Sequence, residues 1–218
     1  DRTPFYAESG GQVGDIGILV SKAGVFKVLD TYKVKEGVFG HWGKVDSGSI
    51  KIDQALDASV DSKNRDDIKR NHSATHLLHK ALKITLGDHV EQKGSLVSAA
   101  RTRFDFSHPK LLTLDEINQI EDIVNSEIMK NKNTETKLID LEEAKKEGAI
   151  MLFGEKYGDK VRVLDIGNSR ELCGGTHVEK TGDICLFKVQ SESGISSGVR
   201  RIEATTGVNI LNMLKEKN

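Results

Sequence analysis

The feature that most constrains the fold is a change of pattern partway along the chain. In the first part, glycines interrupt short apolar runs such as Val25–Leu29 and Val38–Trp42. Turn residues this frequent are typical of a small β barrel or sandwich. Residues 65–86 then contain neither glycine nor proline, and their apolar residues recur with a helical period. The sequence therefore predicts a β-rich, barrel-like unit over residues 1–62 and a second unit over residues 63–207.

Beyond the long helix, strand and helix patterns alternate. A second helix is predicted to begin at Thr113, which forms a capping-box motif with Glu116. The pattern is that of an α+β fold, an antiparallel sheet with helices on one side. Residues 208–218 are predicted to begin a C-terminal helix or linker. The remaining predicted elements are strands at 90–97, 101–106, 134–139, 161–166, 184–190 and 198–204, and a short helix at 141–147.

Composition excludes several classes of protein. The 218 residues include 32 basic and 33 acidic side chains, a net charge of −1, so bulk charge gives no support to nucleic-acid binding. No apolar run approaches the ~18 residues of a membrane span. Two cysteines are too few for a disulfide scaffold and fit a reducing compartment, which predicts a cytoplasmic protein.

Two histidines, His72 and His76, stand four residues apart in the predicted long helix. Side chains at this spacing project from one face, about 5–6 Å apart at Cβ, so both imidazoles can reach one metal ion. A zinc peptidase would need glutamate directly after the first histidine, and Ser73 stands there instead. The alternative is that one histidine is polar and near the helix start while the other packs in the core. His79 shares the face but stays outside the predicted ligand set.

A second pair, Cys173 and His177, is separated by Gly-Gly-Thr. The glycines let the backbone fold tightly, so both side chains converge, and thiolate with imidazole suits zinc. Alone, the pair is as readily a free cysteine beside a surface histidine. Cys185 stands in an apolar stretch and is predicted to be a small core residue. Together, the two pairs predict one tetrahedral metal site made by His72, His76, Cys173 and His177.

These motifs resemble the editing domain of alanyl-tRNA synthetase and the free-standing AlaX trans-editing proteins. The sequence of residues 8–11, Glu-Ser-Gly-Gly, looks more like that of a bacterial synthetase than that of a free-standing protein. The resemblance implies the editing fold common to threonyl- and alanyl-tRNA synthetases. It also implies an internal piece of such an enzyme, without the ATP-binding aminoacylation domain and without the C-terminal region. Further similar segments are residues 1–12, 92–97, 103–108, 152–157 and 198–204.

The activity that the resemblance implies is hydrolysis of the ester that joins serine or glycine to the tRNA for alanine. A pocket for alanine cannot strongly reject an amino acid that differs by one small group, so a second site must remove the wrong products. The implied partner is mischarged tRNA, and the implied cofactor is zinc (Zn2+). Four protein ligands leave a zinc ion no open position, which is typical of a structural site. A catalytic zinc keeps one position for water, and His177 would then not bind the metal. Both arrangements stay open.

The resemblance also implies site residues outside the metal set. Thr75 and Gln92 match family positions near the editing pocket, and we expect them to recognise the substrate or to position water. Without the resemblance, they would be an ordinary helix threonine and strand glutamine. The pair Gly10–Gly11 is either a plain hairpin turn or a loop that helps to present charged tRNA. Candidate phosphate contacts are Arg101, Arg200 and Arg201.

Two other readings compete with the deacylase. One is a zinc-stabilised tRNA-binding module without turnover, and the other is a purely structural zinc fold. Multiple turnover on seryl-tRNA separates the first from an enzyme. Loss of the fold on substitution of Cys173 would indicate the second.

Overall fold

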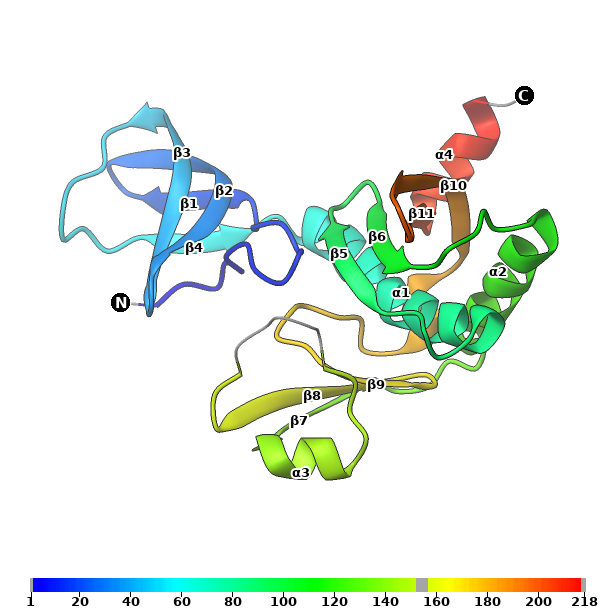
Figure 1. The fold of residues 1–218 in the computed structure, drawn as a ribbon. Helices are drawn as coiled ribbons and strands as arrows, with labels where there is room; N and C mark the ends of the chain where they lie inside the picture. Colours follow the sequence, from blue (N-terminus) through cyan, green and yellow to red (C-terminus); the bar gives the residue numbers. More distant parts are fainter. Residues whose placement is uncertain (1, 152–156, 217–218) are drawn as a thin grey trace.

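The computed structural model describes residues 2–151 and 157–216 (Figure 1). Most of the similar segment at residues 152–157 therefore lies outside the described residues. Within them the chain is α+β, as predicted, with three antiparallel sheets. None of the described helices combines the length and the apolar composition that a membrane span requires.

The first sheet has the strand order β3-β2-β1-β4 and is open. Its two edge strands do not pair with each other, so the predicted barrel is wrong for this part of the chain. The physical reason is that a sheet of four strands is too small for the tilt and stagger that closure requires, and its last strand, β4, has only 4 residues and pairs with β1. The strands are β1 (Gly17–Ser21), β2 (Gly24–Lys35), β3 (Val38–Gly48) and β4 (Asp57–Val60).

The long helix α1 (Ser62–Leu86) begins where the glycine-rich pattern ends. The Asp61 side chain caps it by accepting a hydrogen bond from the amide of Asn64, and Gly87 ends it with a φ of 112°. Most of its middle turns are buried, because α1 packs against α2 (Leu114–Met129) on one side and against a sheet on another. The predicted capping box of Thr113 and Glu116 is present at the start of α2.

The second sheet has the order β10-β11-β6-β5, and α1 and α2 cover it (Figure 1). Phe104 and Phe106 stand two residues apart in β6, on one face of the strand, and both are fully buried in the core between this sheet and the helices. Its strands are β5 (Gln92–Val97), β6 (Thr102–Ser107), β10 (Phe187–Ser196) and β11 (Val199–Thr206).

A third, small sheet stands apart from the second and has its own core. It has the order β7-β8-β9 and packs against the short helix α3 (Leu141–Lys146) through residues such as Ala144 and Val163. The sequence predicted two of these strands but not the third, β9. The strands are β7 (Glu135–Asp140), β8 (Lys160–Ile166) and β9 (Ser169–Leu172).

The segment before β10 corrects one prediction. Cys185 is exposed rather than buried, because the short 3₁₀ helix η1 (Thr181–Ile184) occupies the start of the predicted strand. The amide of Lys180 donates to the Asp183 carboxylate and closes this turn, so the strand begins only at Phe187. The last described element is α4 (Val208–Glu216), where a helix was predicted.

Backbone hydrogen bonds join the N-terminal loop to the second sheet. The amide of Val97 in β5 donates to the carbonyl of Gly11, and the amide of Val13 donates back to the carbonyl of Val97. The guanidinium of Arg65 in α1 also pairs with the buried carboxylate of Asp15. These links place residues 9–15 against the second unit. The division of the chain near residue 62 stays a prediction.

Candidate metal centre and its cavity

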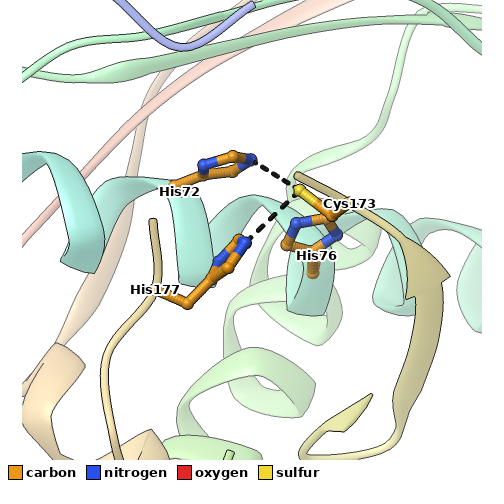
Figure 2. A group of neighbouring side chains, drawn as sticks. All are labelled: His72, His76, Cys173 and His177. Atoms are coloured by element: carbon orange, nitrogen blue, oxygen red, sulfur yellow. Dashed lines mark hydrogen bonds between the residues drawn. The ribbon is translucent and has the colours of Figure 1, made fainter. Parts of the chain in front are cut away.

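The structure brings the four predicted ligands together (Figure 2). His72 and His76 project from α1, and Cys173 and His177 lie in the turn that follows β9. One nitrogen or sulfur atom from each of the four lies within 4.8 Å of the others. The Sγ atom of Cys173 is 3.5 Å from Nε2 of His72 and 3.3 Å from Nε2 of His177.

The two sulfur–nitrogen distances fit a metal ion shared by His72, Cys173 and His177. In a tetrahedral site with bonds of about 2.0–2.1 Å to nitrogen and 2.3 Å to sulfur, the sulfur and nitrogen ligands lie about 3.6 Å apart. In addition, the Nε2 atom of His76 is buried and has no hydrogen-bond partner among the described residues. A buried nitrogen without a partner is costly unless something such as a metal ion binds it. The donor set, one thiolate and three imidazoles, is one that zinc accepts.

The turn between the two C-terminal ligands depends on one of its glycines. A Cβ atom on Gly175 would lie 2.1 Å from Cε1 of His72, so only glycine lets the turn approach this imidazole. The same Cβ on Gly174 would meet nothing within 4 Å. The guanidinium of Arg162 donates to the carbonyls of Cys173 and Gly175, each at 2.9 Å, and holds the turn from the neighbouring strand.

Gln12 orients His72 from the far end of the chain. Its Oε1 atom lies 2.7 Å from Nδ1 of His72 and also accepts from the amide of Thr176 at 2.9 Å. The Gln12 side chain is fully buried. Since Nδ1 donates to this oxygen, the Nε2 atom of His72 carries the lone pair that a metal needs.

Glu171 does the same for His76. Its carboxylate is 3 % exposed and lies 2.8 Å from Nδ1 of His76 and 3.2 Å from Nδ1 of His79. The hydroxyl of Ser169 donates to it at 2.8 Å. His79 is therefore part of the support of the site rather than a ligand. The sequence analysis did not find Glu171, because a single acid two residues before a cysteine carries no recognisable signal.

The charges of the cluster also favour a bound cation. Burial raises the pKa of the Cys173 thiol, but His72 and His76 hold it well below its usual range, so the thiolate is favoured. Burial lowers the pKa of His76, but Glu171 and Cys173 raise it to about 10. Burial and the neighbouring His72 lower the pKa of His177 to about 3. The carboxylate of Glu171 and the thiolate of Cys173 thus stabilise one positive charge between them. That charge is either a proton or a metal ion.

A cavity of about 530 Å³ opens beside the cluster. Thr75 and Gln92, the two residues expected to contact the substrate, both line it. The Thr75 hydroxyl is bonded to the carbonyl of Asn71 at 2.7 Å and lies 2.6 Å from the hydroxyl of Thr102. Their catalytic or binding roles stay predictions.

The glycine pair forms a tight turn at the edge of this cavity. Ser9 and Gln12 exchange backbone hydrogen bonds around it, and the φ angles of Gly10 and Gly11 are +58° and +83°. A Cβ on Gly11 would lie 2.6 Å from the carbonyl oxygen of Ser95. Gly10 lines the cavity. The turn is present, and its role toward tRNA stays a prediction.

The three arginines expected to contact phosphate each face a carboxylate. Arg200 forms two hydrogen bonds with Glu192, and Arg201 forms two with Asp105. Nε of Arg101 lies 3.5 Å from Glu203. None of the three is among the described residues that line the cavity. Their contact with tRNA stays a prediction.

Comparison with known proteins places these observations in a family. Residues 161–203, which carry Cys173 and His177, match the family described as the threonyl and alanyl tRNA synthetase second additional domain. Residues 1–64 match the class II (A) tRNA synthetases. The alanine–tRNA ligase of Delftia acidovorans is 60 % identical over 215 residues, which is 99 % of this chain.

Almost the whole chain is thus similar to part of the alanine–tRNA ligases. The ligase of Polynucleobacter asymbioticus is 59 % identical over 215 residues, and that of Methylobacillus flagellatus is 60 % identical over 207 residues. The matched segment makes up 25 % of the Delftia and Polynucleobacter ligases and 24 % of the Methylobacillus ligase. The chain thus spans about a quarter of the length of these curated relatives. The resemblance found in the sequence motifs is confirmed.

Proposed function

We propose that this chain is the proofreading part of an alanine–tRNA ligase. It hydrolyses the ester that joins serine or glycine to the tRNA for alanine, with zinc on His72, His76, Cys173 and His177. The observation that carries the proposal is the position of this ligand cluster, beside a cavity that Thr75 and Gln92 line. Relationship to alanine–tRNA ligases supports the choice of tRNA.

The reaction needs few groups. The oxygen of a water molecule adds to the ester carbonyl, the bond from the carbonyl carbon to the ribose oxygen breaks, and that oxygen takes up a proton. The products are the free amino acid and a tRNA with a free terminal hydroxyl. Bound zinc would supply positive charge that binds or polarises the aminoacyl group. The neighbouring hydroxyl of the terminal ribose aids the attacking water.

Thr75 can distinguish serine from alanine by hydrogen bonding. Its own hydrogen is donated to the carbonyl of Asn71, and Thr102 lies close enough to donate to its oxygen. One lone pair of the Thr75 oxygen then remains to accept a hydrogen bond from a seryl hydroxyl. A hydrogen bond to the seryl hydroxyl favours serine over alanine, which lacks this group. The contact does not act on glycine, so removal of glycine rests on other features of the cavity.

Gln92 is placed to orient water or the aminoacyl group. It lies in β5 on the wall of the cavity, and its side-chain amide has no hydrogen-bond partner among the described residues. A side-chain amide offers both donors and an acceptor, so it can hold a water molecule and the substrate together.

The competing proposal is a zinc-stabilised tRNA-binding module without turnover. Both predict binding of mischarged tRNA, so the deciding experiment follows the release of serine from a large excess of seryl-tRNA, with alanyl-tRNA as the control substrate. Many turnovers on seryl-tRNA and few on alanyl-tRNA are expected of the deacylase. Binding with less than one turnover per chain would indicate the module.

A further inference from the structure

The cavity beside the metal centre carries an excess of positive charge. Lys33 at the end of β2, and Lys160 and Arg162 in β8, line it. Among the described residues, the only acidic group on its wall is Glu171, which is buried and bonded to two histidines. A chain whose net charge is −1 thus places three cations around one cavity.

In the part of the chain that the structure describes, these three cations are not bound to carboxylates. Lys33 donates to the hydroxyl of Ser9 at 3.0 Å, and Arg162 donates to the carbonyls of the cysteine turn. Within residues 2–151 and 157–216, none of the three forms an ion pair. Arg101, Arg200 and Arg201 differ in this respect, since each faces a glutamate or an aspartate.

We propose that Lys33 and Lys160, with Arg162 behind them, bind a phosphodiester group next to the 3′ end of an RNA strand whose terminal ribose enters the cavity. This inference rests on the proposed function. An ester on the terminal ribose places the phosphate on the 5′ side of that nucleotide only one sugar away. A site that acts on the ester therefore meets this phosphate at its opening, where the two lysines stand.

Lys33, Lys160 and Arg162 have different roles in this proposed site. Lys33 and Lys160 are exposed, and a lysine ammonium binds phosphate as a compact charge without reading the base. Arg162 is half-buried, and one of its guanidinium nitrogens donates a hydrogen bond to the carbonyl of Cys173. Because replacing Arg162 would disturb the metal centre as well, the test uses the two lysines alone.

The test compares two double variants of the metal-loaded chain. Lys33→Gln with Lys160→Gln removes the cations at the cavity. Lys44→Gln with Lys146→Gln removes the same charge from exposed lysines that neither line the cavity nor form ion pairs in the described structure. The probes are two RNA hairpins that carry no amino acid, one with a single-stranded 3′ tail and one with a blunt end. Fluorescence anisotropy measures the affinity of each over a range of salt concentrations.

The proposal predicts that the wild-type chain prefers the tailed hairpin and that this preference falls roughly tenfold in the Lys33→Gln/Lys160→Gln variant. The slope of log affinity against log salt decreases by about 1.4, since each single-strand phosphate contact contributes about 0.7. The Lys44→Gln/Lys146→Gln variant keeps the wild-type preference and slope. Equal behaviour of the two variants, or no preference of the wild-type chain for the tail, would overturn the proposal.

A hydrolysis assay on the same proteins separates this inference from the proposed function. If the cavity lysines bind phosphate, their replacement raises the KM for seryl-tRNA and leaves kcat within about twofold, because neither lysine belongs to the ligand cluster. Loss of tail binding in a chain that never hydrolyses seryl-tRNA would support the phosphate site and contradict the deacylase. Hydrolysis with an unchanged KM would support the deacylase and contradict the phosphate site.

Discussion

The carboxylate of Glu171 lies 2.8 Å from Nδ1 of His76 and thereby orients one of the four side chains of the candidate metal site. The same carboxylate reaches Nδ1 of His79 at 3.2 Å. One buried acid thus orients two histidines on one helical face, and it does so from β9, on the sheet that lies across the cavity from β5.

Replacing Glu171 should weaken the metal site without removing a ligand. In Glu171→Gln, one half of the side-chain amide donates rather than accepts, so His76 and His79 cannot both keep their bonds. We expect metal affinity to fall about 10–100-fold, the usual effect of losing such a partner. Competition with a chromophoric chelator measures this. The exposed Glu179 offers a control, because Glu179→Gln should bind metal like the wild type; equal affinities in all three proteins would refute the assignment.

Cys173→Ala tests whether the metal centre serves the reaction or only the fold. We expect the variant to lose bound metal and hydrolysis, because the thiolate is one of four ligands, while circular dichroism and the thermal midpoint change little. Cys173 is only a partly buried neighbour of the large core between α1, α2 and the second sheet, so most of that core does not involve the cluster. Cys185→Ala, at an exposed position, is the control. An unfolded Cys173→Ala chain would instead indicate a structural zinc site.

The two glycines of the N-terminal turn should respond differently to alanine. Both have positive φ, so both substitutions strain the backbone. Only the Cβ of Gly11→Ala would also press on the backbone of Ser95, at 2.6 Å, and the turn must then move away from β5. We therefore expect Gly11→Ala to lower the free energy of unfolding by about 1–2 kcal/mol more than Gly10→Ala does. Thermal unfolding measures this difference, and we expect kcat/KM to show a loss of transition-state stabilisation of the same size. Indistinguishable variants would mean that the contact with Ser95 does not matter.

Thr75→Val tests recognition of the seryl hydroxyl. The substitution removes one hydroxyl and leaves the volume nearly unchanged, although Thr102 loses a partner. We expect hydrolysis of seryl-tRNA to fall about tenfold more than hydrolysis of glycyl-tRNA, since glycine has no hydroxyl to bind. The ratio of the two rates is the measurement, because it cancels any general loss of stability. An unchanged ratio would mean that Thr75 does not contact this hydroxyl.

Local patterns predicted the helices well. The start of α2 follows from Thr113 and Glu116, whose mutual hydrogen bonds need no distant residue. The grouping of the four candidate ligands was also predictable, because the helical spacing of His72 and His76 and the glycine turn after Cys173 each fix a local geometry.

What the sequence could not predict depends on contacts across the chain. Whether β3 and β4 meet to close a barrel depends on the number and pairing of strands that are far apart in sequence. The roles of Gln12 and Glu171 arise only when the N-terminal loop and β9 meet α1. Cys185 shows the limit of apolar patterns, because one turn closed by Asp183 shifted the start of a strand.

The most direct test of the account measures bound metal and seryl-tRNA hydrolysis on the same sample, before and after chelation and again after zinc is restored. The account predicts about one zinc ion per chain, multiple turnover in the loaded protein, loss of that turnover with the metal and its return with zinc. Full hydrolysis by a chain that holds no metal would contradict it.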